Sequence, residues 1–157
     1  MDDARRDVSL GGASRVPYPR PTDAIATATA KGKANKRSGT KPELRIRSAL
    51  HRRGHRFRKD FAITGPGLRT HVDIAFTRRR VAVFVDGCFW HSCPLHRSTP
   101  KSNQDYWLPK LEANVARDRR VDTRLTELGW TVLRVWEHDD VDASIAKIEA
   151  ALAGRAK

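Results

Sequence analysis

The chain has 157 residues, of which 39% are apolar, so it is long enough for one domain with a hydrophobic core. Its 31 lysines and arginines outnumber its 18 acidic residues, and the formal charge of +13 favours nucleic acid as a partner over a basic surface that is merely solvated. No apolar run approaches the roughly 20 residues that span a bilayer, and the first residues lack the apolar stretch of a signal peptide.

These features predict a cytoplasmic protein that makes no contact with a membrane. Because cytoplasmic thiols stay reduced, the only two cysteines, Cys88 and Cys93, are expected to be metal ligands rather than a disulfide.

The first 39 residues are rich in Ala, Thr, Pro, Gly and Lys and have no sustained apolar period, which predicts a basic, flexible arm. Such an arm either lies along DNA or is simply solvated. The folded domain is predicted over residues 40–153, followed by a short tail at 154–157. It begins with a helix, because Thr40 and Glu43 have capping-box spacing, and Gly54 ends that helix.

The rest of the domain alternates strands and helices. Apolar patterning predicts strands at 55–63, 71–76, 81–86 and 130–137, a loop at 87–103, and helices at 104–128 and 141–152. In the second strand, Val72, Ile74 and Phe76 are expected on one face and Asp73 on the other. The predicted fold class is α/β, with a mixed central sheet flanked by helices.

A metal-binding carboxylate is predicted at Asp73, on the polar face of an otherwise apolar strand. A short hairpin brings it beside the strand that ends at Val85 and Asp86, and hard oxygen ligands on neighbouring strands suit Mg²⁺. The alternative is a carboxylate that only faces solvent.

The loop contains a second candidate metal site. Cys88, Cys93 and His96 have the spacing C-x₄-C-x₂-H, and His138 follows the last strand, so the four can form a closed structural zinc site. The alternative is two buried thiols with exposed histidines. His91, the histidine left over, is either a general acid or base or a passive surface residue.

Large aromatic side chains accompany this loop. Phe89 and Trp90 are adjacent, and Trp107 begins the next helix. Such residues either pack in the core or form a wedge that stacks on bases. Trp130 and Trp136 lie in a strand and are expected in the core.

Together these residues resemble the very-short-patch repair (Vsr) endonucleases. The resemblance covers roughly residues 38–138 and rests on T-K-P-E at 40–43, H-V-D at 71–73, V-D-G-C-F-W-H at 85–91, Y-W-L-P-K at 106–110, N-V-A-R-D at 114–118 and G-W-T-V-L-R-V-W-E-H at 129–138. It implies a restriction-endonuclease-like fold. It also implies a nick 5′ to the thymine of the T·G mismatch left when 5-methylcytosine deaminates.

The resemblance also implies roles for individual residues. Asp73 matches the aspartate that binds Mg²⁺, and Val85 a position that acts through its backbone carbonyl. His91 matches a catalytic histidine and Glu43 an acidic residue that positions water at the metal. The zinc positions correspond to Cys88, Cys93, His96 and His138, and the DNA contacts to Phe89, Trp90, Trp107, Lys110 and Asn114.

Three positions depart from the family pattern. Asp86 stands where the best-known member has a second active-site histidine, so it is expected to act in catalysis, where it could bind metal. His138 replaces a cysteine, for which imidazole is an acceptable substitute. Gly32 and Asn35 lie where the family inserts an apolar wedge into the minor groove, so no such wedge is expected here.

The partners implied are double-stranded DNA with a T·G mismatch and other mismatch-repair proteins, in the cytoplasm at the bacterial nucleoid. A monomer is expected, because a nick in one strand needs one active site. Two alternatives remain. One is a related nuclease with a different DNA target, in defence or restriction. The other is a zinc-stabilised DNA-binding module without catalysis.

Overall fold

The computed structural model describes residues 39–96 and 100–155, and all of them belong to one unit that spans residues 36–157. Its elements follow the predicted order: α2 (Lys41–Arg52), β1 (Arg58–Gly65), β2 (Leu68–Phe76), β3 (Val81–Asp86), α3 (Gln104–Glu127), β4 (Thr131–Trp136) and α4 (Val141–Ala153). The predicted arm, with Gly32 and Asn35, lies outside the described residues except for Gly39, and its extent stays a prediction.

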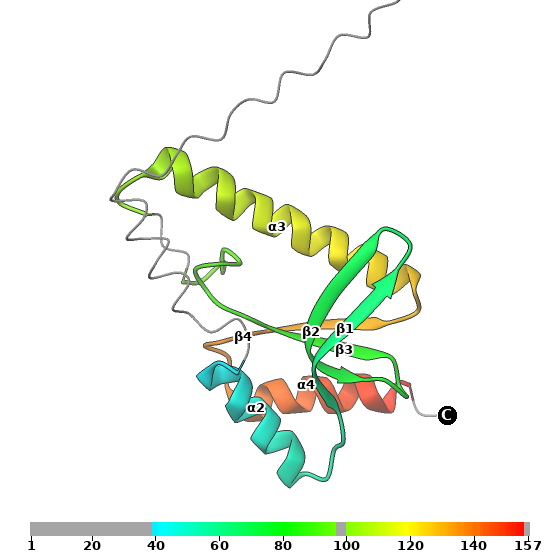
Figure 1. The fold of residues 1–157 in the computed structure, drawn as a ribbon. Helices are drawn as coiled ribbons and strands as arrows, with labels where there is room; N and C mark the ends of the chain where they lie inside the picture. The colour runs from blue at the N-terminus through cyan, green and yellow to red at the C-terminus, as the bar shows by residue number, and fades with distance from the viewer. Residues whose placement is uncertain (1–38, 97–99, 156–157) are drawn as a thin grey trace, which may run out of the picture. The chain divides into compact units, whose positions relative to one another are not determined.

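The described strands form one four-stranded sheet in the order β1-β2-β3-β4. The pairs β1–β2 and β2–β3 are antiparallel and β3–β4 is parallel, which confirms the predicted mixed sheet. Helix α3 covers one face, and α2 and α4 cover the other (Figure 1). Strand β3 is central because its run VAVFVD is apolar toward both layers, and five of its six residues are buried.

Two apolar clusters hold the helices to the sheet. The α2–α4 core consists of buried residues from α2, α4 and one face of the sheet: Ile46, Ala49, Leu50, Ile74, Phe76, Val81, Val83, Val135, Ile145, Ile148 and Leu152. The α3 core lies on the opposite face and consists of Ile63, Leu68, Val72, Ala75, Ala82, Phe84 and Leu125. Helices cover both faces of the sheet, and the candidate site described below lies near the carboxyl ends of β3 and β4.

Helix α2 begins as predicted but not through a standard capping box. The Thr40 hydroxyl donates to Glu43 Oε1 at 2.9 Å and makes no bond to the helix backbone. The backbone N–H of Gly39 donates to Glu43 Oε2 at 2.7 Å, one residue earlier than the motif requires. Gly54 ends the helix with a left-handed φ of 83°, as expected for a C-terminal glycine.

Strand β2 changes the face that it buries at Asp73. The predicted alternation is wrong here: Ile74 and Phe76 pack in the α2–α4 core, whereas Val72 packs in the α3 core. Opposite this point, Asp60 of β1 has a left-handed φ of 45°, and the ladder has no pair at Asp60 and Asp73 although it is in register on both sides. This local distortion breaks the period-two pattern and leaves Asp73 half-buried.

The aromatic side chains of the last strand region are less buried than predicted. Trp130, just before β4, packs against the α3 core but is only half-buried, and Trp136 at the end of β4 is half-buried as well. In α3, Leu111 and Leu125 are buried, while Val115, and Leu128 just after the helix, are only partly covered. Among the described residues, no helix has both the length and the apolar content that crossing a bilayer requires.

Candidate active site and metal centre

Asp73 lies against β3, as the hairpin predicted. Its Oδ2 accepts a hydrogen bond from the backbone N–H of Val85 at 2.8 Å, while Oδ1 accepts none from the described residues. Desolvation and the negative charge of Glu43 raise the pKa of Asp73 to about 6, against the lowering effect of the Val85 hydrogen bond. A cation at Oδ1 would offset the free energy that burial of the charged Asp73 carboxylate costs. The site therefore offers the hard oxygen donors that suit Mg²⁺.

Glu43 is joined to the Asp73 strand by an arginine that the sequence analysis missed. Arg47 Nη2 lies 3.0 Å from Glu43 Oε2 and donates to the backbone carbonyl of Asp73 at 2.8 Å. The pair is nearly buried, and Arg47 Nε has no partner in the described part of the chain. The i,i+4 spacing of Glu43 and Arg47 is the only sequence signal for this link. It fixes α2, and with it the Glu43 carboxylate, against β2.

His91 has one ring nitrogen held by carboxylates. Its Nδ1 lies 2.6 Å from Asp118 Oδ2 and 3.7 Å from Asp86 Oδ1. Desolvation disfavours the imidazolium, but the Asp118 hydrogen bond and the charge of Asp86 outweigh it and raise the pKa of His91. Its Nε2 has no hydrogen-bond partner among the described residues, so that atom is the one able to exchange a proton with a substrate.

Asp86 faces an arginine rather than Asp73. Both of its carboxylate oxygens lie 2.9 Å from Arg134 Nη1, and the residue is only 3% exposed. Burial raises the pKa of Asp86, although the charge of Arg134 opposes the shift. Neither Arg134 nor Asp118 was found from the sequence. They reach this point only because β4 packs against α3, which no local pattern reveals.

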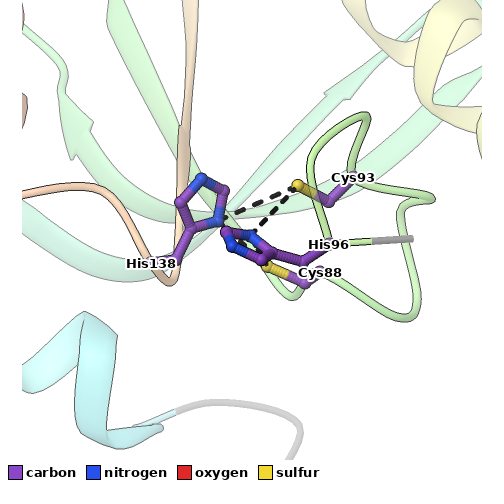
Figure 2. A group of neighbouring side chains, drawn as sticks. All are labelled: Cys88, Cys93, His96 and His138. Atoms are coloured by element: carbon purple, nitrogen blue, oxygen red, sulfur yellow. Dashed lines mark hydrogen bonds between the residues drawn. The ribbon is translucent and has the colours of Figure 1, made fainter. Parts of the chain in front are cut away.

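The four predicted zinc ligands come together from two distant segments (Figure 2). The ligand atoms of Cys88, Cys93, His96 and His138 all lie within 4.8 Å of one another. Nδ1 of His138 lies 3.0 Å from Cys88 Sγ and 3.8 Å from Cys93 Sγ, and His96 Nδ1 lies 3.9 Å from each sulfur. A tetrahedral zinc site separates its ligand atoms by about 3.5 Å. The Cys₂His₂ set therefore fits a zinc ion.

The loop that holds Cys88, Cys93 and His96 is also connected to the end of β4. The backbone N–H of Cys88 donates to Glu137 Oε1 at 2.7 Å, one residue before His138. This contact and the cluster of predicted zinc ligands connect the ends of β3 and β4, and so restrict the residues between Cys88 and Cys93.

The aromatic residues of the loop form a cluster with the start of α3, called here the aromatic cluster: Phe89, Trp90 and Trp107. Ring centroids lie 5.1 Å apart for Phe89 and Trp90, 5.7 Å for Phe89 and Trp107, and 6.0 Å for Trp90 and Trp107. All three are half-buried, and they lie in neither of the two cores. The three rings therefore pack partly against one another and remain partly exposed to solvent.

The two predicted base-reading residues contact this cluster. Lys110 Nζ lies 5.5 Å from the centroid of the Trp107 ring and donates to the Tyr106 hydroxyl at 3.2 Å. Asn114 Nδ2 donates to the backbone carbonyl of Trp90 at 3.3 Å. Both residues thus lie beside the aromatic rings, and their spacing of four places them on one helical face.

The mixed four-stranded sheet with helices on both faces has the restriction-endonuclease-like fold. The catalytic domain of the homing endonuclease I-Bth0305I shares this fold: it superimposes with a TM-score of 0.53 at 18% identity, and the match covers 76% of this chain and 100% of that domain.

Sequence comparisons agree with the fold. Residues 25–97 match the family model described as DNA mismatch endonuclease Vsr. The type II nicking enzyme V.NaeI of Lentzea aerocolonigenes is 52% identical over 132 residues, covering 83% of this chain and 78% of the relative. The DNA mismatch endonuclease Vsr of Escherichia coli K12 is 41% identical over 98 residues, covering 60% and 59%. This chain belongs to the Vsr family, and it is a DNA endonuclease.

Proposed function

We propose that the enzyme nicks one strand of duplex DNA 5′ to the thymine of a T·G mismatch, and so repairs deaminated 5-methylcytosine. The observation that carries this proposal is the aromatic cluster, in which Phe89 and Trp90 lie on the same loop as His91 and Trp107 lies at the start of α3. A T·G wobble pair stacks less well than a matched pair, so opening the helix there costs less. Half-buried rings, with Phe89 edge to face against both tryptophans, can stack into such an opened step, with Lys110 and Asn114 beside the exposed bases.

The proposed chemistry divides between two groups of residues. Asp73 and the Val85 carbonyl hold Mg²⁺, which when bound polarises the scissile phosphate and makes water a stronger nucleophile. Glu43, fixed by Arg47, orients the attacking water. His91 donates a proton from Nε2 to the leaving oxygen, a role that suits its raised pKa. Asp86 contributes by facing His91 rather than by binding the metal.

Zinc is proposed as a structural ion only. A site with four protein ligands leaves no open position for water or substrate, so it braces the loop without taking part in the cleavage. The ligand set Cys88, Cys93, His96 and His138 supports that role.

The proposal is tested by incubating the enzyme with Mg²⁺ and duplexes that differ only at one base pair, T·G or matched, with each strand labelled separately. The expected result is a single nick in the strand that contains the mismatched thymine. Equal cleavage of matched duplexes, or cleavage of both strands, would contradict it. A monomer is expected to be sufficient for nicking. The dependence of the nicking rate on enzyme concentration checks this expectation.

Replacing Trp90 with alanine is expected to lower the rate of mismatch cleavage roughly ten- to a hundredfold, because base–aromatic stacking contributes about 1–3 kcal/mol. The measurement is the ratio of T·G to matched cleavage. Leu95→Ala is the matched control, since Leu95 is an apolar side chain of the same loop that is 77% exposed. If both variants keep the wild-type ratio, the aromatic cluster does not read the mismatch.

A second candidate function is nicking at a target other than a mismatch. The relative from Lentzea aerocolonigenes is named a type II nicking enzyme, and that name mentions no mismatch. If this candidate holds, matched duplexes that contain the target are nicked in one strand, and adding a T·G pair has no effect. The same strand-resolved assay, run on a pool of matched sequences, distinguishes the two functions.

A further inference from the structure

A half-buried guanidinium, that of Arg134, lies at the centre of a charged network beside His91. Arg134 projects from β4 and contacts three carboxylates at once. Its Nη1 lies 2.9 Å from both oxygens of Asp86, its Nε lies 3.1 and 3.0 Å from the two oxygens of Asp122, and its Nη2 lies 3.6 Å from Asp118 Oδ1. One face of the guanidinium stacks on the Phe84 ring at 4.6 Å.

Two of these three carboxylates also face the imidazole. Asp118 and Asp86 lie 2.6 and 3.7 Å from His91 Nδ1, whereas Asp122 bonds to Arg134 on the side away from Asp86. The planar fork of an arginine can hold two carboxylates in fixed directions, which the single ammonium of lysine cannot do. The network therefore runs from Asp122 through Arg134 to the two carboxylates at His91.

We propose that Arg134 is a positioning residue of the nicking reaction: it holds Asp86 and Asp118 against His91 Nδ1, so that Nε2 alone is presented to DNA. This inference rests on the proposed proton transfer by His91. It also explains how an aspartate serves at the position of Asp86, because Arg134 neutralises that buried carboxylate and keeps both of its oxygens away from the metal at Asp73.

Two other roles for Arg134 fit the geometry less well. A contact with a DNA phosphate needs a free N–H, yet Nε and both terminal nitrogens already face carboxylates, and the side chain is only 21% exposed. A purely stabilising role is also a poor explanation, because buried ion pairs contribute little net stability compared with apolar residues of the same size. Holding Asp86 and Asp118 in place beside His91 accounts for these contacts of Arg134.

The test compares Arg134→Met, which removes the charge, with Arg134→Lys, which keeps the charge but cannot fork between Asp86 and Asp122. Arg124→Met is the control, because Arg124 forms an exposed ion pair with Glu127 elsewhere on α3. The zinc-loaded, ¹⁵N-labelled proteins are examined by long-range ¹H–¹⁵N NMR where the His91 ring is neutral, with His91→Gln identifying its signals.

Wild type and Arg124→Met are expected to show His91 with its proton on Nδ1. Arg134→Met is expected to show a mixture of tautomers, and Arg134→Lys a smaller change. In single-turnover nicking, Arg134→Met should be about ten- to a hundredfold slower, as when an orienting partner is lost. Arg134→Lys should lie between it and wild type, with DNA affinity unchanged in both.

The inference is overturned if either folded variant keeps the wild-type tautomer and rate, or if its rate loss comes entirely from weaker DNA binding. The lysine variant retains the buried charge and so keeps the test open if Arg134→Met does not fold. The NMR readout needs no DNA. Failure of wild-type enzyme to nick T·G duplexes would therefore count against the proposed function and not against the arrangement at His91.

Discussion

Asp73→Ala is expected to reduce nicking by more than about a thousandfold while leaving DNA binding largely intact. The loss of several kcal/mol of transition-state stabilisation corresponds to that factor, since each 1.36 kcal/mol changes the rate tenfold. Asp73 contributes a half-buried carboxylate that faces the β3 backbone and belongs to neither apolar core, so its removal deletes a proposed metal ligand rather than part of a core. Rates are measured under single-turnover conditions and affinity with Ca²⁺ in place of Mg²⁺.

Two further variants separate charge from structure. Asp73→Asn can still accept the Val85 hydrogen bond but lacks the negative charge, and it should be nearly as inactive as the alanine variant. Asp60→Asn is the matched control: Asp60 lies opposite on β1, is exposed and pairs with His71, and asparagine tolerates the left-handed φ of 45° at this position. It should nick at close to the wild-type rate. Full activity in either Asp73 variant would contradict the metal assignment.

Cys93→Ser is expected to prevent stable folding of the domain at ordinary temperature. Cys93 is fully buried and its sulfur faces both predicted histidine ligands, so the substitution removes a ligand from the only metal cluster found within the described residues. For structural zinc, binding energy is folding energy, and it amounts to about 10–16 kcal/mol in zinc-finger peptides. Metal analysis of wild type should find about one zinc per chain, and chelation should lower its melting temperature.

His138 provides the sharper test of the ligand set. His138→Ala should lose zinc and stability, whereas His138→Cys should keep both, because thiolate and imidazole are interchangeable at such sites. His71→Ala controls for loss of an imidazole outside the cluster. Wild-type protein that contains no zinc, yet melts cooperatively at a temperature unchanged by chelators, would show that the cysteines and histidines are not ligands.

The order of elements and the positions of the candidate metal ligands could be predicted because each depends on local patterns. Apolar periods of 3.6 and 2 distinguish helices from strands, and Gly54 marks a helix end that the structure confirms. The Cys88, Cys93 and His96 spacing lies within one loop, so three of the four ligands needed no knowledge of the fold. The structure places His138 beside them because β4 runs parallel to β3.

Local patterns failed where two segments impose a geometry on each other. The alternation along β2 predicted one face for Val72 and Ile74, but the distortion at Asp60 on the neighbouring strand places them in different cores. Glu43 looked like a capping residue, yet its carboxylate also pairs with Arg47, which bonds to the β2 backbone.

The sequence by itself determined the fold class, the residue types of the candidate metal ligands and the aromatic residues, since these depend on residue type and short-range spacing. Only the tertiary structure decided which charged groups meet: Asp118 and Arg134 are polar residues of an ordinary helix and strand until α3 packs against β4. The physical reason is that buried ion pairs have no sequence period. A carboxylate and a guanidinium that folding removes from water must be paired, and the packing of the elements decides which two groups meet.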